Sequence, residues 1–160
     1  MIEWGRRDGV HFVHGELTVG EALAPPLIKK VKWTADPDLL TIIDAAPGTA
    51  CPAVEAVKGA DACVLVTEPT PFGLNDLQLA VDLVRGLNIP LGVVVNRCDV
   101  GDSRVEDYCR AENIPILAKM PLDRRLAVHY SNGEPIVTHD ATWKRTFEAL
   151  FQKVVGLVSE

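Results

Sequence analysis

Two short polar groups in the sequence have the residue types and spacing to bind a nucleotide, and each follows an apolar run. Asp44 ends the run Leu39–Asp44 and forms the pattern D-x-x-x-G with Gly48. A carboxylate in this arrangement can hold Mg²⁺ through water, while the glycine N–H approaches a terminal phosphate. This interpretation makes Asp44 a metal-binding and, with Gly48, a catalytic residue. The alternative is that Asp44 only caps the turn before Pro52.

The second group is N-R-x-D, which spans Asn96, Arg97 and Asp99 and follows the apolar run Pro90–Val95. An amide can donate to and accept from adjacent atoms of a purine edge, and a nearby carboxylate can fix the loop or accept from the base. The three residues are therefore candidates for binding the base of a nucleotide. A plain polar turn is the alternative, since Asn and Asp favour turns.

A third segment, Pro121 to Asp123, could add backbone and an apolar wall to the same base pocket. A proline turn in which Asp123 caps a helix explains these residues equally well. Both Pro121 and Asp123 are kept as candidate cofactor-binding residues.

The sequence gives little support for a cysteine site, a histidine metal site or a phosphate loop. The four cysteines are separated by 12, 35 and 11 residues, so no C-x-x-C pair is present and free thiols are expected. The four histidines offer no i, i+4 pair on a helix, and a metal site built from them is not expected. The sequence contains no G-x-x-x-x-G-K-[ST] phosphate loop.

Apolar runs of two kinds alternate along the chain and predict the elements that position these residues. Short runs predict strands, and runs with apolar residues three and four positions apart predict helices. The helix at the end of the chain carries an apolar stripe that is expected to pack in the core. Predicted strands are 10–14, 39–44, 62–67, 90–95 and 114–118, and predicted helices are 25–32, 52–59, 75–86, 105–112 and 142–158.

The chain has 160 residues, 48% of them hydrophobic, 6% aromatic, and a net charge of −6. These values predict one α/β domain over residues 1–160. The alternation of strands and helices with right-handed crossovers predicts a doubly wound, mostly parallel sheet, whose carboxyl-end edge binds ligands. The acidic balance argues against nucleic acid as a partner. No apolar stretch is long enough to span a bilayer and the N-terminus is too polar for a signal peptide, which predicts a cytoplasmic protein.

Three segments together resemble the MinD superfamily of P-loop ATPases: Asp44–Pro52, Val64–Gly73 and Val93–Arg97. More narrowly, they look like the branch with an inserted ferredoxin domain, in the CobQ/CobB/MinD/ParA group often labelled cobyrinic acid a,c-diamide synthase. The resemblance covers about residues 15–135, and Thr67–Gly73 is its most specific part.

The resemblance implies a P-loop NTPase-like fold and an ATP-dependent switch that dimerises around the nucleotide. It places Asp44 on the magnesium side, Gly48 near the γ-phosphate, Asn96 at adenine and Pro121 beside the base. ATP and Mg²⁺ are therefore the implied cofactors. A homodimer, an N-terminal segment not in this sequence, or an iron–sulfur protein is the implied partner.

Members of this branch carry a phosphate loop and an insert with two runs of cluster cysteines, and this chain has neither. It resembles the C-terminal portion of the family, without the strand that would lie between the strands ending at Asp44 and Thr67. The unpaired edges must then meet, be filled by another chain or swapped segment, or reflect a fragment of a longer product. The chain alone should bind nucleotide weakly and be inactive. A non-catalytic interaction module is the alternative function.

Overall fold

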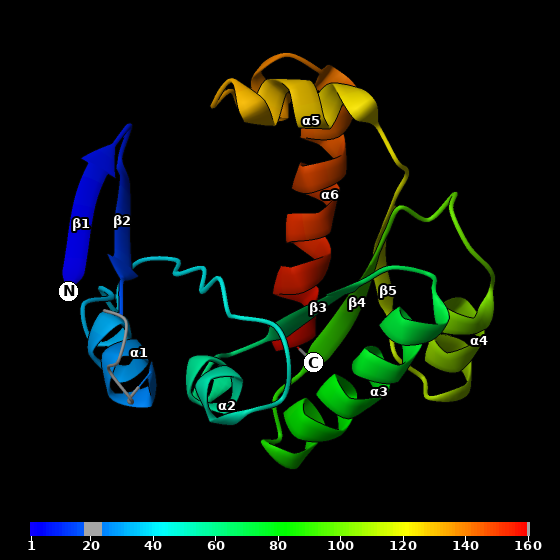
Figure 1. Cartoon of the computed structure of the whole chain (residues 1–160), viewed down its shortest axis with the longest axis horizontal. Helices are drawn as coiled ribbons and strands as arrows, with labels where there is room; N and C mark the ends of the chain where they lie inside the picture. Colours follow the sequence, from blue (N-terminus) through cyan, green and yellow to red (C-terminus); the bar gives the residue numbers. More distant parts are fainter. Residues whose placement is uncertain (18–23, 160) are drawn as a thin grey trace. The chain divides into compact units, whose positions relative to one another are not determined.

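The computed structural model describes residues 1–17 and 24–159, and the chain divides into two compact units, Met1–Gly59 and Ala60–Glu160. Figure 1 follows the elements from blue to red along the sequence. The prediction of one domain over residues 1–160 stays a prediction.

The first unit begins with an antiparallel hairpin of strands β1 (Ile2–Arg7) and β2 (Val10–Gly15). Asp8 and Gly9 form its two-residue turn with φ angles of 50° and 81°. Both residues have positive φ, as a type I′ turn requires. The strand predicted at residues 10–14 is confirmed, whereas β1 was not predicted. The Asp-Gly pair before β2 is the signal that indicates its hairpin partner.

Two helices complete the first unit: α1 (Ala24–Lys32) and α2 (Cys51–Val57). The Lys32 ammonium donates to the backbone carbonyls of Glu55 (2.9 Å), Ala56 (2.9 Å) and Lys58 (2.6 Å). These carbonyls lie at the C-terminal end of α2, where a helix leaves acceptors unpaired and a positive charge is favourable. Lys32 thereby fastens α1 to the end of α2. Both helices were predicted.

The strand predicted at Leu39–Asp44 is wrong. These residues form neither helix nor strand, and the side chains of Leu40 and Ile42 are 71% and 86% exposed. A strand exists only through hydrogen bonds to a neighbouring strand, and the two sheets of the described residues contain only β1 with β2 and β3 with β4 and β5. The apolar sequence therefore has the composition of a buried strand without a sheet to join.

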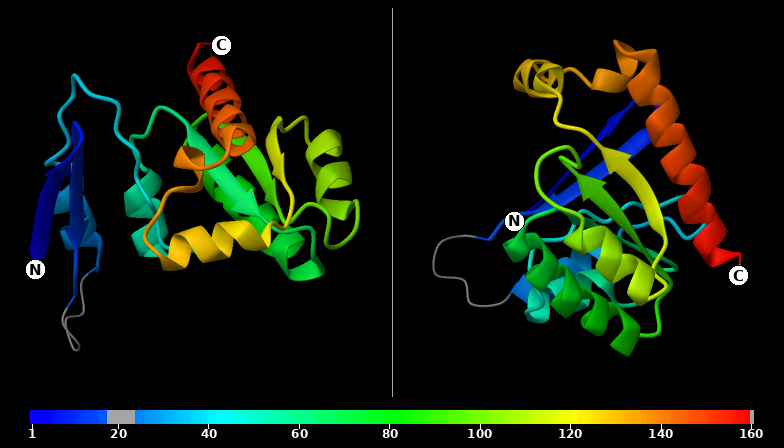
Figure 2. Two further views of the ribbon diagram at one scale, coloured as in Figure 1. Left: turned by 90° about the horizontal axis from the view of Figure 1, so that it is seen from above. Right: turned by 90° about the vertical axis from the view of Figure 1, so that its right-hand side faces the viewer.

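The second unit is built on a parallel sheet of β3 (Cys63–Thr67), β4 (Leu91–Asn96) and β5 (Ile116–Met120), in that spatial order. Helices α3 (Pro71–Gly86) and α4 (Arg104–Ala111) cover one face, and α6 (Ala141–Val158) lies on the other (Figure 2). The predicted α/β class with a doubly wound parallel sheet is confirmed. All three strands were predicted at nearly these positions.

The core of this unit lies between the sheet and helices α3 and α4. Burial raises the pKa of the Cys109 thiol within it. The inward side chains of β4 pack against the apolar faces of the two helices. These faces are formed by apolar residues three and four positions apart in the sequence. Its fully or nearly buried members are Leu77, Val81, Val93, Val95, Val105, Cys109 and Ile114.

Helix α3 begins at Pro71, four residues before the predicted start at residue 75. Thr70 is the N-cap, and its hydroxyl accepts from the N–H of Gly73 at 3.0 Å. Pro71 stands in the first turn, where its missing N–H costs nothing and its fixed φ suits a helix. The proline at the start of this segment therefore begins the helix earlier than the predicted residue 75.

Two elements between β5 and α6 were not among the predicted ranges: helix α5 (Arg124–Ser131) and a short 3₁₀ helix, η1 (Ile136–Thr138). The alternative interpretation of Asp123 as a helix cap is confirmed by α5. Trp143 of α6 is buried, as expected for its apolar stripe. Phe147 and Phe151 of the same stripe are 40% and 42% exposed, which departs from the core packing predicted for them. Among the described residues, no helix has both the length and the apolarity to cross a membrane.

Candidate functional site

The loop after β3 is held in one conformation by the residues of the most specific sequence string. The Thr67 hydroxyl donates to the carbonyl of Gly73 at 2.9 Å, and Thr70 caps the same residue from the other side. A Cβ atom on Gly73 would overlap the carbonyl oxygen of Glu68. The threonines and the glycine of Thr67–Gly73 are therefore required by the fold of the loop, independently of any ligand.

The loop after β4 packs directly against the loop after β3. The Arg97 guanidinium lies 3.3 Å from the Glu68 carboxylate. Asp102 donates its N–H to the carbonyl of Pro69 at 3.3 Å, and a Cβ atom on Gly101, whose φ is 134°, would overlap that carbonyl. Arg97 itself has a positive φ of 50°. The turn thus directs its guanidinium to the edge of the sheet.

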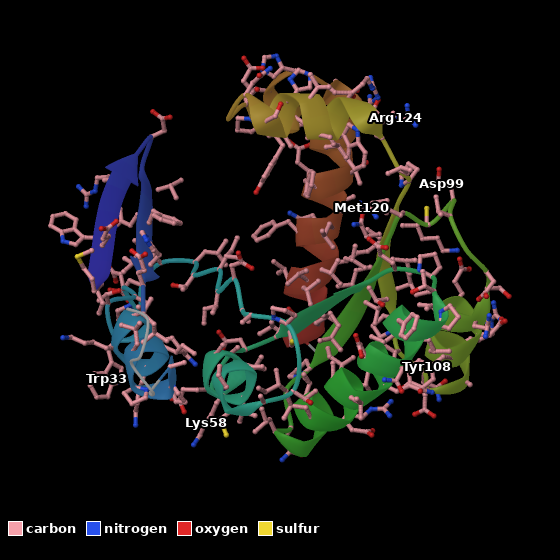
Figure 3. The ribbon with its side chains drawn as sticks, in the orientation of Figure 1. Trp33, Lys58, Asp99, Tyr108, Met120 and Arg124 are labelled. Carbon is pink, nitrogen blue, oxygen red and sulfur yellow. The ribbon has the colours of Figure 1, made fainter. Side chains whose placement is uncertain are left out.

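The loop after β5 is tied to the loop after β4 by two hydrogen bonds. Cys98 donates its N–H to the carbonyl of Met120 at 3.0 Å, and the Asp99 carboxylate accepts from the N–H of Leu122 at 2.7 Å. Figure 3 labels Asp99 and Met120, close to each other at the ends of the strands. Asp99 therefore fixes the loop, one of the two roles that the sequence allows for it.

Asp123 is the centre of a polar network that joins α5 to α6. Its carboxylate accepts from the N–H of Arg125 at 2.9 Å, which caps α5, and from the Arg125 guanidinium at 2.6 Å. The indole N–H of Trp143 donates to it at 3.1 Å. Arg125 also lies 2.9 Å from Asp140, the N-cap of α6. The guanidinium and the indole hold the pKa of Asp123 well below its usual range.

A cleft of about 330 Å³ opens beside this network. Lys119, Pro121, Asp123 and Trp143 are among the residues that line it. Its volume is at the lower end of the range for small-molecule sites. Lysine and arginine on its wall give it donors for an anionic or polar ligand.

The structure brings together five of the predicted site residues at the carboxyl-end edge of the sheet. Pro121 and Asp123 line the cleft. Asn96 pairs in register with Met120 at the end of β4 and is half-buried, but it is not among the residues that line this cleft. The five residues are Asn96, Arg97, Asp99, Pro121 and Asp123.

The other two predicted residues, Asp44 and Gly48, belong to the first unit and are exposed. Gly48 has a φ of 96°, which favours glycine, and no atom lies within 4 Å of where its Cβ would be. Sequence reasoning did not identify Arg125 or Trp143 as parts of the site. The pair Asp123-x-Arg125 before a helix is the one local signal for Arg125, and nothing local marks Trp143.

Residues 17–156 match the family described as ParA, NUBPL iron-transfer P-loop NTPase. An uncharacterized protein of Methanocaldococcus jannaschii is 30% identical over 135 residues, which cover 83% of this chain and 47% of that protein. The iron-sulfur cluster carrier protein of Pyrococcus horikoshii is 29% identical over 150 residues, covering 84% of this chain and 50% of that protein. The chain thus spans about half the length of these curated relatives.

Among solved structures, the MinD cell division protein of Aquifex aeolicus matches with a TM-score of 0.62. The match covers 86% of this chain and 60% of that one at 22% identity, and it supports the fold alone. The predicted MinD/ParA resemblance is confirmed, while its narrower cobyrinic acid label stays a prediction. With the family match over 17–156, these findings establish that the chain belongs to the ParA family of P-loop NTPases, in the group described by iron transfer.

Proposed function

We propose that this chain supplies the base-side loops and the magnesium-side carboxylate of a ParA-type nucleotide site whose phosphate loop lies outside this sequence. One observation carries the proposal. Strand β3 pairs only with β4 among the described residues, and its Val66 side chain is 66% exposed. Parallel strands are normally covered on both faces and paired within the sheet. The open side of β3 is where the family resemblance places the phosphate-loop strand.

The residues of the base side have distinct roles in this proposal. Asn96 reads the adenine edge, since its amide can both donate and accept. Arg97 and Asp99 hold the loops, as their contacts with Glu68 and with the Leu122 N–H indicate. Pro121 supplies an apolar wall. Asp123 acts through Arg125, which it keeps oriented at the cleft.

The phosphate side in this proposal consists of Asp44 and Gly48. An exposed carboxylate is a suitable ligand for water-coordinated Mg²⁺. The open backbone of Gly48 leaves room for a phosphate to approach its N–H. Bound Mg²⁺ would neutralise phosphate charge, and this chain's residues would orient the ion and the nucleotide.

We further propose that the nucleotide switch works with an iron–sulfur partner. Several curated relatives are named iron-sulfur cluster carrier proteins. The four cysteines here are Cys51, Cys63, Cys98 and Cys109, in four different segments, and burial raises the pKa of Cys63 and of Cys109. Buried thiols with raised pKa values are poor cluster ligands. The partner would therefore supply the cluster ligands. This chain would make the interaction with the partner depend on the bound nucleotide.

Purification of the chain from its native source, followed by mass spectrometry, tests whether the phosphate loop lies outside this sequence. We expect a co-purifying or covalently continuous polypeptide that contains G-x-x-x-x-G-K-[ST]. In that assembly, Asp44→Asn should abolish Mg²⁺-dependent ATP hydrolysis, while the matched control Asp38→Asn should leave it unchanged. Asn96→Ala should weaken ATP binding, and Asn75→Ala on the outside of α3 should not.

Two results would contradict the proposal. One is micromolar MgATP affinity of the 160-residue chain alone in calorimetry, since the main phosphate contacts are absent from its sequence. The other is unchanged ATP turnover in Asp44→Asn. A complex that forms through the β3 side but hydrolyses no ATP would favour the alternative function, a non-catalytic interaction module.

A further inference from the structure

Three metal-ligating side chains meet between α5 and α6. They are His129 in the last turn of α5, Glu134 in the loop that follows, and His139 directly after η1. One ligand atom from each lies within 4.8 Å of the other two. His129 is half-buried, and the other two residues are exposed. Figure 1 shows α5 and the segment that returns from it to α6.

The backbone fixes the positions of the first two residues. Helix α5 ends in a Schellman motif, in which Gly133 has a φ of 70°. Gly133 donates its N–H to Tyr130 at 3.0 Å, and Glu134 donates its N–H to the carbonyl of His129 at 2.9 Å. This last hydrogen bond returns the chain over the end of the helix. It places Glu134 beside His129 irrespective of their side chains.

The third residue is fixed by η1. Pro135 precedes this helix, and Ile136 is buried, which anchors the segment in the unit. His139 donates its backbone N–H to the carbonyl of Ile136 at 2.9 Å and so stands at the end of the same turn. Its ring stacks on the ring of His129 with the centroids 4.7 Å apart and the planes 16° from parallel.

The donor atoms have the spacing that a single metal ion requires. His129 Nδ1 lies 3.2 Å, and His139 Nε2 lies 3.5 Å, from the same oxygen of Glu134, Oε2. Donors bound at about 2.0–2.1 Å to one tetrahedral Zn²⁺ are separated by about 3.3 Å from each other. The two imidazole donors lie within 4.8 Å of each other, and the stacked rings must rotate out of their nearly parallel arrangement for both lone pairs to point at one ion.

We propose that His129, Glu134 and His139 bind one divalent transition-metal ion, with the remaining coordination positions open to water. Two imidazoles and one carboxylate are a donor set that suits Zn²⁺ in a tetrahedral site or Fe²⁺ in a facial arrangement. The ion would connect the C-terminal end of α5 to the segment before α6. It would thereby brace the wall of the nearby cleft, because Asp123 and Arg125 at the start of α5 line it.

This site has no signature of the usual kind in the sequence. Histidine ligands on a helix are expected at i, i+4, whereas these ligands are five residues apart across a helix end and a turn. Their convergence depends on Gly133 adopting a positive φ and on Ile136 being buried. Neither property defines a metal motif by itself.

Metal titration of the chelator-treated full chain tests the proposal, with ZnCl₂ in calorimetry and, under anaerobic conditions, ferrous sulfate. We expect one ion per chain with micromolar or tighter affinity, and NMR shifts at the His129 and His139 rings. Glu134→Gln keeps the size of an exposed side chain and should weaken binding at least tenfold. His129→Ala and His139→Ala should do the same. Co²⁺ absorption gives the coordination geometry independently.

The controls separate this site from the other potential ligands of the chain. His14 lies 3.7 Å from Glu3 on the hairpin, so His14→Ala removes a second His–Glu pair. Cys51→Ser removes an exposed thiol. Both variants should bind the metal like the unaltered chain. Unchanged affinity in Glu134→Gln would overturn the proposal, as would affinity weaker than millimolar for both metals or loss of binding in the control variants alone.

Discussion

Gly73 occupies a place in α3 that no larger residue fits. A methyl group there would overlap the carbonyl of Glu68 and come within 2.9 Å of the Thr67 hydroxyl oxygen. Gly86 at the other end of the same helix has open space around its Cβ position. The two glycines therefore form a matched pair for separating steric need from helix propensity.

We expect Gly73→Ala to lower the free energy of unfolding by about 1–3 kcal/mol, because the backbone of the loop must move. Gly86→Ala should leave it unchanged or raise it by about 0.5–1 kcal/mol, since alanine is the better helix former. Urea unfolding followed by circular dichroism measures both. Equal effects of the two substitutions would show that the close approach to Glu68 has no energetic importance.

Asp123 predicts a pH dependence of stability. Hydrogen bonds from Arg125 and Trp143 hold its pKa below the value of about 3.9 expected in the unfolded chain. The resulting stabilisation is complete above about pH 5, decreases as the pH falls below about 4, and is lost below the folded-state pKa. Asparagine retains the ability to cap α5 but carries no charge.

The difference in free energy of unfolding between the unaltered chain and Asp123→Asn should therefore be constant above pH 5 and shrink below pH 4. Unfolding curves at a series of pH values measure it. Asp140→Asn is the companion variant, because the pKa of Asp140 is also lowered, chiefly by the N–H of Thr142. A difference that grows with acid would contradict the assignment.

At the scale of elements, the contact between α1 and α2 depends on one cation. Lys32→Met removes the donor that serves three carbonyls at the end of α2 while keeping most of the apolar stem. We expect the amides of α2 to exchange faster by the equivalent of about 1–2 kcal/mol. Lys30→Met on the exposed side of α1 is the control. Hydrogen exchange detected by NMR distinguishes them, and equal protection in both variants would contradict this role.

The elements that sequence reasoning identified correctly are those with a complete local signal. The run 90–95 and the helix before it combine periodicity, a terminating Gly86 and a proline boundary. One error lies where the outcome depends on distant partners, because the run 39–44 has a strand's composition but no neighbouring strand. The start of α3 is a different error, since Thr70 next to Pro71 is a local capping signal that was not recognised.

The same division holds for the candidate site. Parallel-sheet topology places Asn96, Asp99 and Asp123 at one edge, and this follows from strand positions alone. The hydrogen-bond partners of these residues do not follow from the strand positions. Trp143 lies 20 residues from Asp123 along the chain, and its hydrogen bond exists only because α6 crosses the sheet at that place.

On the scale of the whole molecule, the second unit has an apolar area that its own elements leave open. Helix α6 contacts β4 and β5, while Val64 and Val66 of β3 are exposed, as are Phe147 and Phe151 of α6. Edge strands with exposed apolar side chains promote association, and a lysine on such a strand prevents it.

We expect the chain alone to self-associate as its concentration rises, and Val66→Lys to suppress this association. Val100→Lys is the control, because Val100 is a comparably exposed valine in a loop. Sedimentation velocity over a concentration series measures the effect. Identical sedimentation of the unaltered chain and Val66→Lys at every concentration would mean that the open side of β3 does not mediate contacts.

The hydrogen bond from the Asp102 N–H to the Pro69 carbonyl connects the loop after β4 to the loop after β3. We expect a disturbance that reaches Glu68 to be transmitted to the loop of Asn96, because the Arg97 ion pair and the close contact at Gly101 connect the two loops. The NMR signal of the Asp102 amide therefore reports on contacts made beside β3. Its proton signal should respond when anything docks beside β3, even at a distance from the docked surface.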